Sequence, residues 1–376
     1  MECKLSDVCT FRKGKVSVLG LSKKTYISTE NMLPNKGGVT KASSLPAVEM
    51  TQEYRKGDIL VSNIRPYFKK IWQAKYDGGC SNDVLVFQGN QNIDKDFLYY
   101  TLANDEFFAY SMATSKGTKM PRGDKVSIMQ YQVPVFDINT QKKIANVLKV
   151  LDEKIELNTM INNNLLEQAK TLYKDWFFDF SPFSTDGSIP YDWRMGTVGD
   201  IIQLYDSKRV PLSGAKRDRM EKLYPYYGAT SLMDYVDNYL FNGIFLLLGE
   251  DGTVVDSLGF PILQYVYGKF WVNNHAHVIT GKEGFSVEEL FLFFSLTNIN
   301  TIVTGAVQQK VSQQNLKKVP AIIPTKEVLS AFDNIIQPIF AQIRTLRDEN
   351  LYLADLRDVL LPKLMSGELD VSDIDF

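Results

Sequence analysis

Apolar residues recur at steps of three and four along two long stretches of the chain, and the two stretches match each other. The first seam contains Leu148, Leu151, Ile155, Asn158, Asn162, Leu165, Ala169, Leu172 and Trp176. The second seam contains Ile336, Ile339, Ile343, Leu346, Asn350, Leu353, Arg357, Leu360 and Leu364, each 188 residues after its counterpart. Steps of this kind are typical of helices. We therefore predict two copies of one unit, each ending in a long helix.

The spacing of the seams also predicts that the two helices pair. A repeat of about 3.5 residues, below the roughly 3.6 of a straight helix, is typical of a left-handed coiled coil. We expect an antiparallel pair that acts as a spacer, in which the first seam is a rod about 42 Å long at ~1.5 Å per residue. Pro338 lacks a backbone donor, so we expect the straight part of the second helix to begin near it.

Asparagines occupy seam positions 158, 162 and 350 in the two helices. A partly buried asparagine costs stability but fixes the register and the choice of partner helix, so these three are candidate register marks. The alternative is that the three positions lie at a wet edge of the seam.

Before each helix the pattern changes to short β-like runs separated by Gly and Pro. These runs are residues 58–63, 83–87 and 132–136 in the first half, and 243–248, 264–268 and 276–280 in the second. Corresponding positions in the two halves are Asp7 and Asp200, Asn82 and Asn274, and Val133-Pro134 and Val319-Pro320. A stretch with Ser, Thr, Gly and Pro at residues 179–190 is typical of a linker.

The repeat predicts an α+β fold with a pseudo-twofold internal repeat. We expect two globular domains that mix helix and sheet, separated by the two long helices. The expected boundaries are a first globular domain at residues 1–140, a long helix at 141–180, a second globular domain at 181–326, and a long helix with an acidic tail at 327–376.

Composition narrows the class of protein. The three cysteines, Cys3, Cys9 and Cys80, include no CxxC pair and indicate a reducing compartment rather than a disulfide framework. No stretch is apolar enough to span a membrane and the N-terminus lacks a secretory core, so we expect a cytoplasmic protein. Residues 1–140 hold 19 Lys and Arg against 14 Asp and Glu, whereas residues 327–376 hold 4 against 10. A basic first domain suits contact with a polyanion and an acidic tail suits contact with protein, although five extra charges also suit a solvated surface.

Several catalytic signatures are missing from the sequence. We find no phosphate-binding GxxxxGK[ST] loop, no GxGxxG and no HExxH. Pro-Pro is also absent, so the Asn-Pro-Pro-aromatic segment expected of an adenine methyltransferase does not occur. His275 and His277 would share one face of a strand, but no third metal ligand is evident, and a packed or hydrogen-bonded role is the simpler interpretation. Asp152, Glu153 and Glu156 are interpreted as a solvated helix face. We predict no catalytic or metal site in this chain.

Positive and polar residues among aromatics give the better chemical signal. In the first half the candidate nucleic-acid contacts are Asn63, Arg65, Tyr67, Lys69, Lys70, Lys116, Lys119 and Arg122. In the second half they are Lys208, Arg209, Lys216, Arg217, Arg219, Gln308, Gln309 and Lys310. Lys and Arg suit phosphates, and Asn, Gln and Arg suit base edges. The segment from Gly305 to Lys310 stands where residues 116–122 stand in the first copy. Ordinary exposed loops could show the same residue types.

The order of variable domain, long helix, variable domain, long helix resembles the specificity subunit of type I restriction–modification enzymes. The similar segments are Gly57-Asp58-Ile59-Leu60-Val61-Ser62, Gln141-Lys142-Lys143-Ile144-Ala145, Leu151-Asp152-Glu153-Lys154-Ile155, Ala169-Lys170, Leu172-Tyr173, Trp176-Phe177, Leu356-Arg357-Asp358 and the run from Leu360 to Glu368. The likeness extends over essentially the whole chain. In the second copy, Gly243-Ile244-Phe245-Leu246-Leu247-Leu248 departs from the first motif and lacks the Arg-Lys-Lys run that follows it.

The resemblance implies that each globular domain is a target recognition domain for one half of a bipartite, asymmetric site in double-stranded DNA. It also implies two modification (methyltransferase) subunits docked on the helices and restriction subunits that translocate and cut. S-adenosylmethionine, ATP and Mg would then belong to those partner subunits, with no cofactor in this chain. The chain would supply specificity rather than catalysis. Two alternatives remain: a self-sufficient DNA methyltransferase or nuclease, and a coiled-coil scaffold that does not bind DNA.

Overall fold

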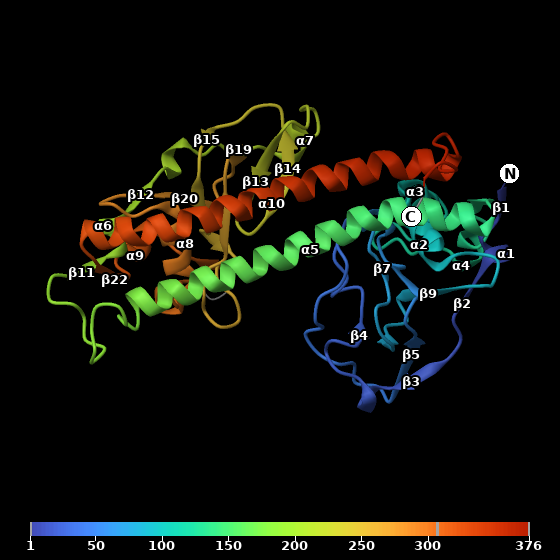
Figure 1. The fold of residues 1–376 in the computed structure, drawn as a ribbon, viewed down its shortest axis with the longest axis horizontal. Coiled ribbons are helices and arrows are strands. Elements are labelled where there is room, and N and C mark those ends of the chain that lie inside the picture. Colours follow the sequence, from blue (N-terminus) through green and yellow to red (C-terminus); the bar gives the residue numbers. More distant parts are fainter. Residues whose placement is uncertain (1, 306–307, 375–376) are drawn as a thin grey trace. The chain divides into compact units, whose positions relative to one another are not determined.

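The structure is a computed structural model that describes residues 2–305 and 308–374. The chain divides into two compact units (Figure 1). Unit 1 contains the described residues up to Leu157 together with those from Glu349 onward, and unit 2 contains residues 158–348. The two long helices are α5 (Ile138–Phe177) and α10 (Lys326–Ser366). Each unit therefore includes a part of both long helices.

Unit 1 is built on two four-stranded sheets. One sheet has the order β2-β9-β6-β7 and is antiparallel throughout, and the other has the order β3-β5-β8-β4 with β4 parallel to β8. Its strands are β1 (Glu2–Lys4), β2 (Cys9–Phe11), β3 (Lys15–Ser17), β4 (Tyr26–Ile27), β5 (Met50–Tyr54), β6 (Ile59–Ser62), β7 (Ile71–Gln73), β8 (Gly78–Cys80), β9 (Val84–Gly89) and β10 (Gln132–Pro134). Its shorter helices are α1 (Leu5–Val8), α2 (Lys95–Ala103), α3 (Asp105–Ala113) and α4 (Lys125–Ile128).

Unit 2 has the corresponding sheets β12-β20-β16-β18 and β14-β13-β19-β15. Its strands are β11 (Arg194–Thr197), β12 (Ile202–Leu204), β13 (Tyr224–Tyr227), β14 (Leu232–Val236), β15 (Phe241–Asn242), β16 (Phe245–Gly249), β17 (Asp251–Gly252), β18 (Leu263–Val266), β19 (Lys269–Val272), β20 (Ala276–Gly281), β21 (Gln309–Lys310) and β22 (Pro320–Ile323). Its shorter helices are α6 (Val198–Ile201), α7 (Gly214–Arg217), α8 (Val287–Leu296) and α9 (Gln313–Lys317).

Local structure confirms the internal repeat. Asp7 and Asp200 play the same part, because each carboxylate accepts a hydrogen bond from the backbone N–H three residues earlier, at 3.0 Å from Lys4 and at 2.8 Å from Thr197. The strand that contains Val133 pairs with β1, and its counterpart β22 pairs with β11. The central strands β6 and β16 are almost wholly apolar because the sheet buries both of their faces.

The second sheets of the two units carry their extra strands at opposite edges. β4 is parallel to β8, and β13 is parallel to the corresponding strand β19. β4 and β13 are therefore equivalent strands. In unit 1 the extra strand β3 pairs with β5, whereas in unit 2 the extra strand β14 pairs with β13. The two copies therefore diverge before β4, where unit 2 has no strand equivalent to β3, and again directly after β4 and β13.

The seam residues pack as predicted in each unit. None of the eighteen seam positions is exposed, and Leu148 and Asn158 are fully buried. In unit 1, Leu148 packs in one core with Leu361 and Leu364, while Lys154 lies 3.6 Å from Glu349, so the helix segments run antiparallel. The core of unit 2 joins Tyr173 of α5 to Phe332 of α10, whose ring centroids are 5.5 Å apart.

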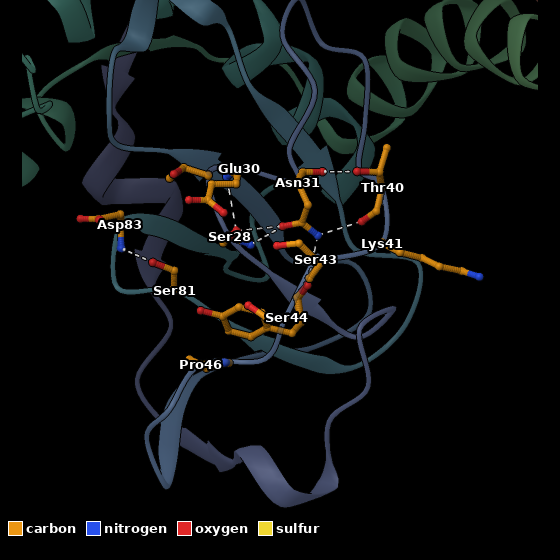
Figure 2. Close-up of a pocket in the computed structure, with 13 residues that line it drawn as sticks. Ser28, Glu30, Asn31, Thr40, Lys41, Ser43, Ser44, Pro46, Ser81 and Asp83 are labelled. Carbon is orange, nitrogen blue, oxygen red and sulfur yellow. Dashed lines mark hydrogen bonds between the residues drawn. The ribbon is translucent and has the colours of Figure 1, made fainter. Parts of the chain in front are cut away.

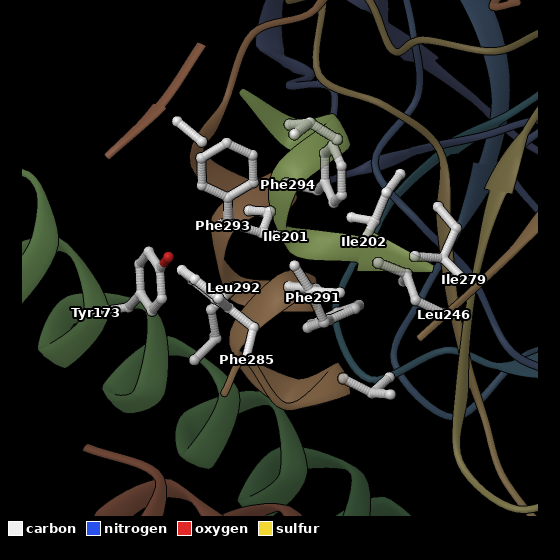
Figure 3. Close-up of a cluster of buried hydrophobic side chains, with 14 of the residues drawn as sticks. Tyr173, Ile201, Ile202, Leu246, Ile279, Phe285, Phe291, Leu292, Phe293 and Phe294 are labelled. Atoms are coloured by element: carbon white, nitrogen blue, oxygen red, sulfur yellow. The ribbon is translucent and has the colours of Figure 1, made fainter. Parts of the chain in front are cut away.

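Aromatic side chains enlarge the core of unit 2 beyond the predicted seam. Figure 3 shows Tyr173 among side chains of α8 and of the β12-β20-β16 strands. Phe332 and Phe340 of α10 are buried there as well, although neither is one of the nine predicted seam residues. The helix α8 begins with a capping box in which Ser286 and Glu289 satisfy each other's backbone N–H groups.

The bounds of both long helices differ from the expected ones. α10 begins at Lys326 and continues through Pro338, so the helix itself does not start at the proline. Pro338 is exposed, so its ring is on the solvent side of the helix, where it displaces no core side chain. The first helix covers residues 138–177 rather than 141–180. Within the described residues, no helix is long and apolar enough to cross a membrane.

Candidate nucleic-acid interface

In unit 1 the two basic segments found in the sequence lie against each other. Residues 63–70 follow β6, and residues 116–122 form a hairpin closed by hydrogen bonds of 2.9 Å in both directions between Lys116 and Arg122. The backbone N–H of Arg65 donates to the carbonyl of Pro121 at 2.8 Å, and Gly123 donates to Asn63 at 3.2 Å. We call the combined surface of residues 63–70 and 116–122 edge 1.

The backbone of edge 1 is held in an unusual conformation. Arg65 and Lys69 both have φ of 51°, in the left-handed region that non-glycine residues rarely adopt. The 3₁₀ turn Pro66–Phe68 lies between them and leaves Tyr67 and Phe68 exposed. The Oδ1 atom of Asn63 and the Nε atom of Arg65 are buried without a hydrogen-bond partner among the described residues. Strain and unmet hydrogen bonding at one place are typical of functional surfaces.

Several cations of edge 1 are already paired with carboxylates. Lys69 bonds Asp105 at 2.7 Å, Lys116 bonds Asp124 at 2.5 Å, and Arg122 lies 3.3 Å from Asp83. The Lys116 ammonium, with help from Ser127, lowers the pKa of Asp124 to about 2. These pairs are largely exposed, so solvent and salt weaken them and a phosphate can compete for the cation.

Lys70 and Lys119 differ from those three. The Nζ atom of Lys70 donates to the carbonyl of Thr29 at 2.6 Å, and burial lowers its pKa although Glu30 opposes the shift. Lys70 therefore ties edge 1 to the loop that follows β4. Lys119 is exposed at the tip of the hairpin and has no ion partner in the described part of the chain.

Unit 2 has an equivalent surface at the matching place. Asp251 pairs with Lys310 and Gly252 with Gln309, and Thr304 and Lys310 exchange backbone hydrogen bonds of 2.9 and 2.7 Å. The N–H of Glu250 donates to His275 at 2.8 Å, just as that of Asn63 donates to Asp83 at 2.8 Å in unit 1. We call residues 250–252, 304–305 and 308–310 edge 2. Ala306 and Val307 of the predicted segment lie outside the described residues.

The chemistry of edge 2 is different from that of edge 1. Asp251 accepts from Nδ1 of His275 at 2.6 Å on the exposed side, and Glu250 lies 3.6 Å from Lys310. Glu250 and Asp251 of edge 2 thus occupy the positions that Asn63 and Ile64 occupy in edge 1. Gln308 and Lys310 are exposed on the hairpin and Gln309 is half-buried.

A cluster with metal-ligating residue types lies beneath edge 2. Asp206, Glu250 and His277 each contribute one possible ligand atom, and these three atoms lie within 4.8 Å of one another. The sequence alone had shown no further ligand near this histidine. The guanidinium of Arg209 supplies a positive charge there, 2.6 Å from Glu250 and 3.7 Å from Asp206. Both ring nitrogens of His277 are engaged, Nδ1 with Asp206 at 2.6 Å and Nε2 with the carbonyl of Val311 at 2.8 Å. Despite burial, the hydrogen bond from His277 keeps the pKa of Asp206 below its usual value. The donor set is satisfied within the protein and does not call for a metal ion.

Some of the other predicted contact residues of unit 2 are engaged in ion pairs within the protein, and the rest are exposed. Arg209 is held as described, and Arg217 bonds Asp234 at 3.0 Å and stacks on Tyr226 with 4.8 Å to the ring centroid. Lys208, Lys216 and Arg219 are exposed. Arg209 and Arg217 are therefore placed to support the fold, and the three exposed cations are the better candidates for contact with a polyanion.

The sequence did not single out a polar cavity of about 420 Å³ next to edge 1. Its walls come from the loop after β4 and from the turn before β9, and Figure 2 shows their hydroxyl and carboxylate groups. The lining residues include Ser28, Thr29, Glu30, Thr40, Lys41, Ser43, Ser44, Ser81 and Asp83. The only signal in the sequence is the Ser and Thr content of residues 28–44, which is also ordinary for a surface loop.

The two units match one family model. The model, described as the type I restriction modification DNA specificity domain, matches residues 1–167 and 190–346. The chain belongs to this family. The chain therefore has a DNA sequence-specificity role and contains two target recognition domains, one in each matched segment.

Relatives of this specificity chain cover nearly its whole length. The type I restriction enzyme MjaIX specificity subunit of Methanocaldococcus jannaschii is 26% identical over 85% of this chain and 79% of that protein. The type I restriction enzyme HindI specificity subunit of Haemophilus influenzae is 25% identical over 92% of this chain and 94% of that protein. The crystal structure of the type I restriction–modification S subunit from M. genitalium aligns with a TM-score of 0.55 at 16% identity, over 97% of this chain and 96% of that one. The last similarity is one of fold.

Proposed function

We propose that the chain is the non-catalytic specificity subunit of a type I restriction–modification enzyme and that each unit reads one half of a bipartite, asymmetric DNA site. The observation that carries the proposal is the equivalence of edge 1 and edge 2. The same hairpin and the same strand-end loop occur in both units, but with different side chains. Two surfaces that share a backbone arrangement but carry different side chains suit two half-sites of different sequence.

Edge 1 is the more basic of the two surfaces. Its cations suit contacts with phosphates, which position a protein on DNA, and its Asn63 and Arg65 suit base edges. On edge 2, Gln308, Gln309 and Lys310 would make the corresponding contacts. The carboxylates of Glu250 and Asp251 would disfavour phosphates and would accept from the amino group of cytosine.

The partners in the proposal are two modification subunits and the restriction subunits. Their docking surfaces are the outward faces of the long helices, which carry exposed apolar residues. In unit 1 these are Val150, Leu157, Leu351, Tyr352 and Val359. Exposed apolar groups of this kind favour contact with protein. S-adenosylmethionine, ATP and Mg would be bound by these partner subunits, which would supply methyl transfer and cleavage.

The proposal places the complex in the cytoplasm. Cys9 and Cys80 are buried free thiols whose pKa burial raises to about 12, and Cys3 is free and half-buried. Free thiols suit a reducing compartment.

The experiment begins with mapping the methylated adenines in host DNA, which identifies the bipartite site. Gel shifts of the full chain with its modification partner are then measured on that site and on a version with two base pairs added between the halves. We expect the lengthened site to lose most of its affinity, because α5 and α10 contribute to both units and would set the separation of the halves. Equal binding to both DNAs would contradict the spacer role. Methyl transfer or cleavage by the purified chain alone would contradict the non-catalytic assignment.

A further inference from the structure

The loop that forms the cavity of unit 1 is held by internal hydrogen bonds although it has little regular structure. Asn31 is only 5% exposed and uses its whole amide. Its Oδ1 accepts from the N–H of Ser28 at 2.6 Å and from the hydroxyl of the same residue at 3.1 Å. Its Nδ2 donates to the carbonyls of Tyr26 at 3.1 Å and Thr40 at 2.8 Å. Figure 2 shows these bonds crossing the loop.

Apolar anchors hold the same loop on the sheet. Met32 is 1% exposed and packs in the core with Leu60 and Trp72. Ala42 is buried and its N–H donates to the carbonyl of Lys23 at 2.8 Å. These contacts fix the position of the polar groups at the mouth of the cavity, as specific recognition requires.

The cavity and edge 1 share a wall. Lys70 of edge 1 bonds Thr29, which lines the cavity, and Arg122 pairs with Asp83, which lines it as well. The backbone of Asn35 and Lys36 donates to Phe68 and Lys69 at 2.8 and 2.9 Å. A DNA duplex that rests its backbone on edge 1 would bring its bases to the neighbouring cavity.

The lining indicates which chemical group the cavity accepts. Small-molecule pockets are mostly apolar, whereas this cavity is lined by hydroxyls, by the carboxylates of Glu30 and Asp83, and by the exposed Lys41. Two carboxylates against one lysine disfavour a phosphate. Asp83 is occupied by Arg122, and Glu30 is exposed at the mouth. A carboxylate accepts from exocyclic amino groups such as N4 of cytosine, and Ser and Thr can either donate or accept.

The repeat gives an independent reason to assign recognition to this loop. One of the places where the two units diverge lies directly after β4 and β13, where unit 1 has the loop of residues 28–49 and unit 2 has the edge strand β14. A duplicated protein that reads two different half-sites must differ where it touches bases.

We propose that this cavity is a base-reading site of unit 1, in which Glu30, Ser43 and Ser44 bind a DNA base edge that carries an exocyclic amino group. The proposal rests on the proposed function, since it takes DNA as the ligand of unit 1. Asn31 acts in it as a positioning residue that holds the loop. Edge 1 holds the phosphates beside the cavity.

The test uses the full chain with its modification partner and a pool of duplexes in which the half-site of unit 1 is randomised. Glu30→Gln replaces the acceptor by an amide that also donates. We expect the preference for cytosine or adenine to fall about tenfold or more at one or two positions of that half-site. The other half-site and the salt dependence of binding should stay unchanged. Ser43→Ala with Ser44→Ala should weaken the preference at the same positions.

Glu2→Gln is the matched control, because Glu2 is an exposed carboxylate of the same unit that lies in β1, outside the loop and the cavity. Its base preferences should equal those of the natural chain. Unchanged base preferences for Glu30→Gln, in a protein that binds its site specifically, would overturn the base-reading role of the cavity. A loss of affinity that is uniform over all sequences would overturn it too. If the natural chain selects no sequence at all from the pool, the proposed function itself fails.

Discussion

The cations of edge 1 differ in whether a carboxylate already neutralises them in the free chain. The cations paired with Asp83, Asp105 and Asp124 are neutralised in the free chain, and Lys119 at the hairpin tip is not. A phosphate that binds Arg122 must displace its carboxylate, whereas one that binds Lys119 displaces only water and counterions. The electrostatic part of DNA binding should therefore depend most on the hairpin tip.

We expect the double substitution Lys119→Ala and Arg122→Ala to weaken DNA binding to a similar extent for all sequences. The slope of log affinity against log salt should fall by about one to two, because each lost phosphate contact releases fewer counterions. Binding titrations at several salt concentrations measure this slope. Lys56→Ala is the control, since Lys56 is exposed in the same unit before the opposite end of β6. A loss confined to one base position would speak against phosphate contact.

A second prediction concerns the buried carboxyl group of Glu289 in unit 2. Burial raises its pKa to about 8, while its hydrogen bond with Ser286 opposes the shift and Asp333 adds to it. The folded state therefore binds a proton that the unfolded state has lost between about pH 4.5 and pH 8. The stability of unit 2 should fall as the pH rises through this window, by an amount on the order of a few kcal/mol.

Glu289→Gln should remove this dependence, because an amide does not titrate. Thermal unfolding of the natural and variant chains from pH 5 to pH 8.5 provides the comparison. The difference in Tm between the two chains should change steadily across this range. A constant difference would show that Glu289 keeps one protonation state in the folded and unfolded chain.

At the level of elements, the long helices were predictable and their ion pairs were not. Asp152 was interpreted as part of a solvated face, but it accepts from Arg357 of α10 at 2.7 Å and from the hydroxyl of Tyr100 at 2.8 Å. Burial and the Asp152 carboxylate raise the pKa of Tyr100. The seam position of Arg357 is thus explained by its partner across the helix pair.

Asp152→Asn should destabilise unit 1 by about 1–3 kcal/mol, because the mostly buried Arg357 guanidinium loses its carboxylate partner across the helix pair and keeps only the exposed Asp358. Chemical denaturation followed by a signal from unit 1 measures the loss. Glu156→Gln is the matched control on the same helix. Its pair with Lys75 is about half exposed on both sides, so the effect should be small. Equal losses in the two variants would contradict the assigned difference in burial.

The sequence revealed the helices and central strands because their patterns are local. The steps of three and four fixed α5 and α10 to within a few residues, and the apolar runs located β6, β9, β16 and β20. The interface was harder to predict. Edge 1 joins residues more than fifty positions apart, and the roles of Arg209 and Arg217 depend on Glu250 and Asp234, which are distant in sequence. Pairings of this kind follow from tertiary contacts that no local pattern encodes.

At the level of the whole molecule, the C-terminal end of the chain belongs to the N-terminal unit. Leu361, Leu364 and Met365 of α10 are buried in the core that also contains β6, α2 and the start of α5. Unit 2 is formed by the continuous stretch of residues 158–348. The recognition surface at edge 1 thus rests on a core that the last helix completes.

Leu364→Ala should therefore destabilise unit 1 by about 2–5 kcal/mol through loss of buried apolar volume and leave unit 2 unaffected. Hydrogen exchange with mass spectrometry can follow β6 and β16 separately. Protection of β6 should fall and that of β16 should not. Leu351→Ala, at a position 62% exposed on the same helix, should change neither. Equal loss of protection in both strands would show that the two units unfold together.

The division of the chain also determines the order in which the protein can fold as it is synthesised. The ribosome completes residues 158–348 before it makes the helix segment that unit 1 needs, and domains generally fold as units when their residues become available. Unit 2 can therefore fold first although it comes second in the gene. The N-terminal recognition domain has to wait for the last residues of the chain, and a nascent protein that is cut short there would hold a finished second domain and an unfinished first one.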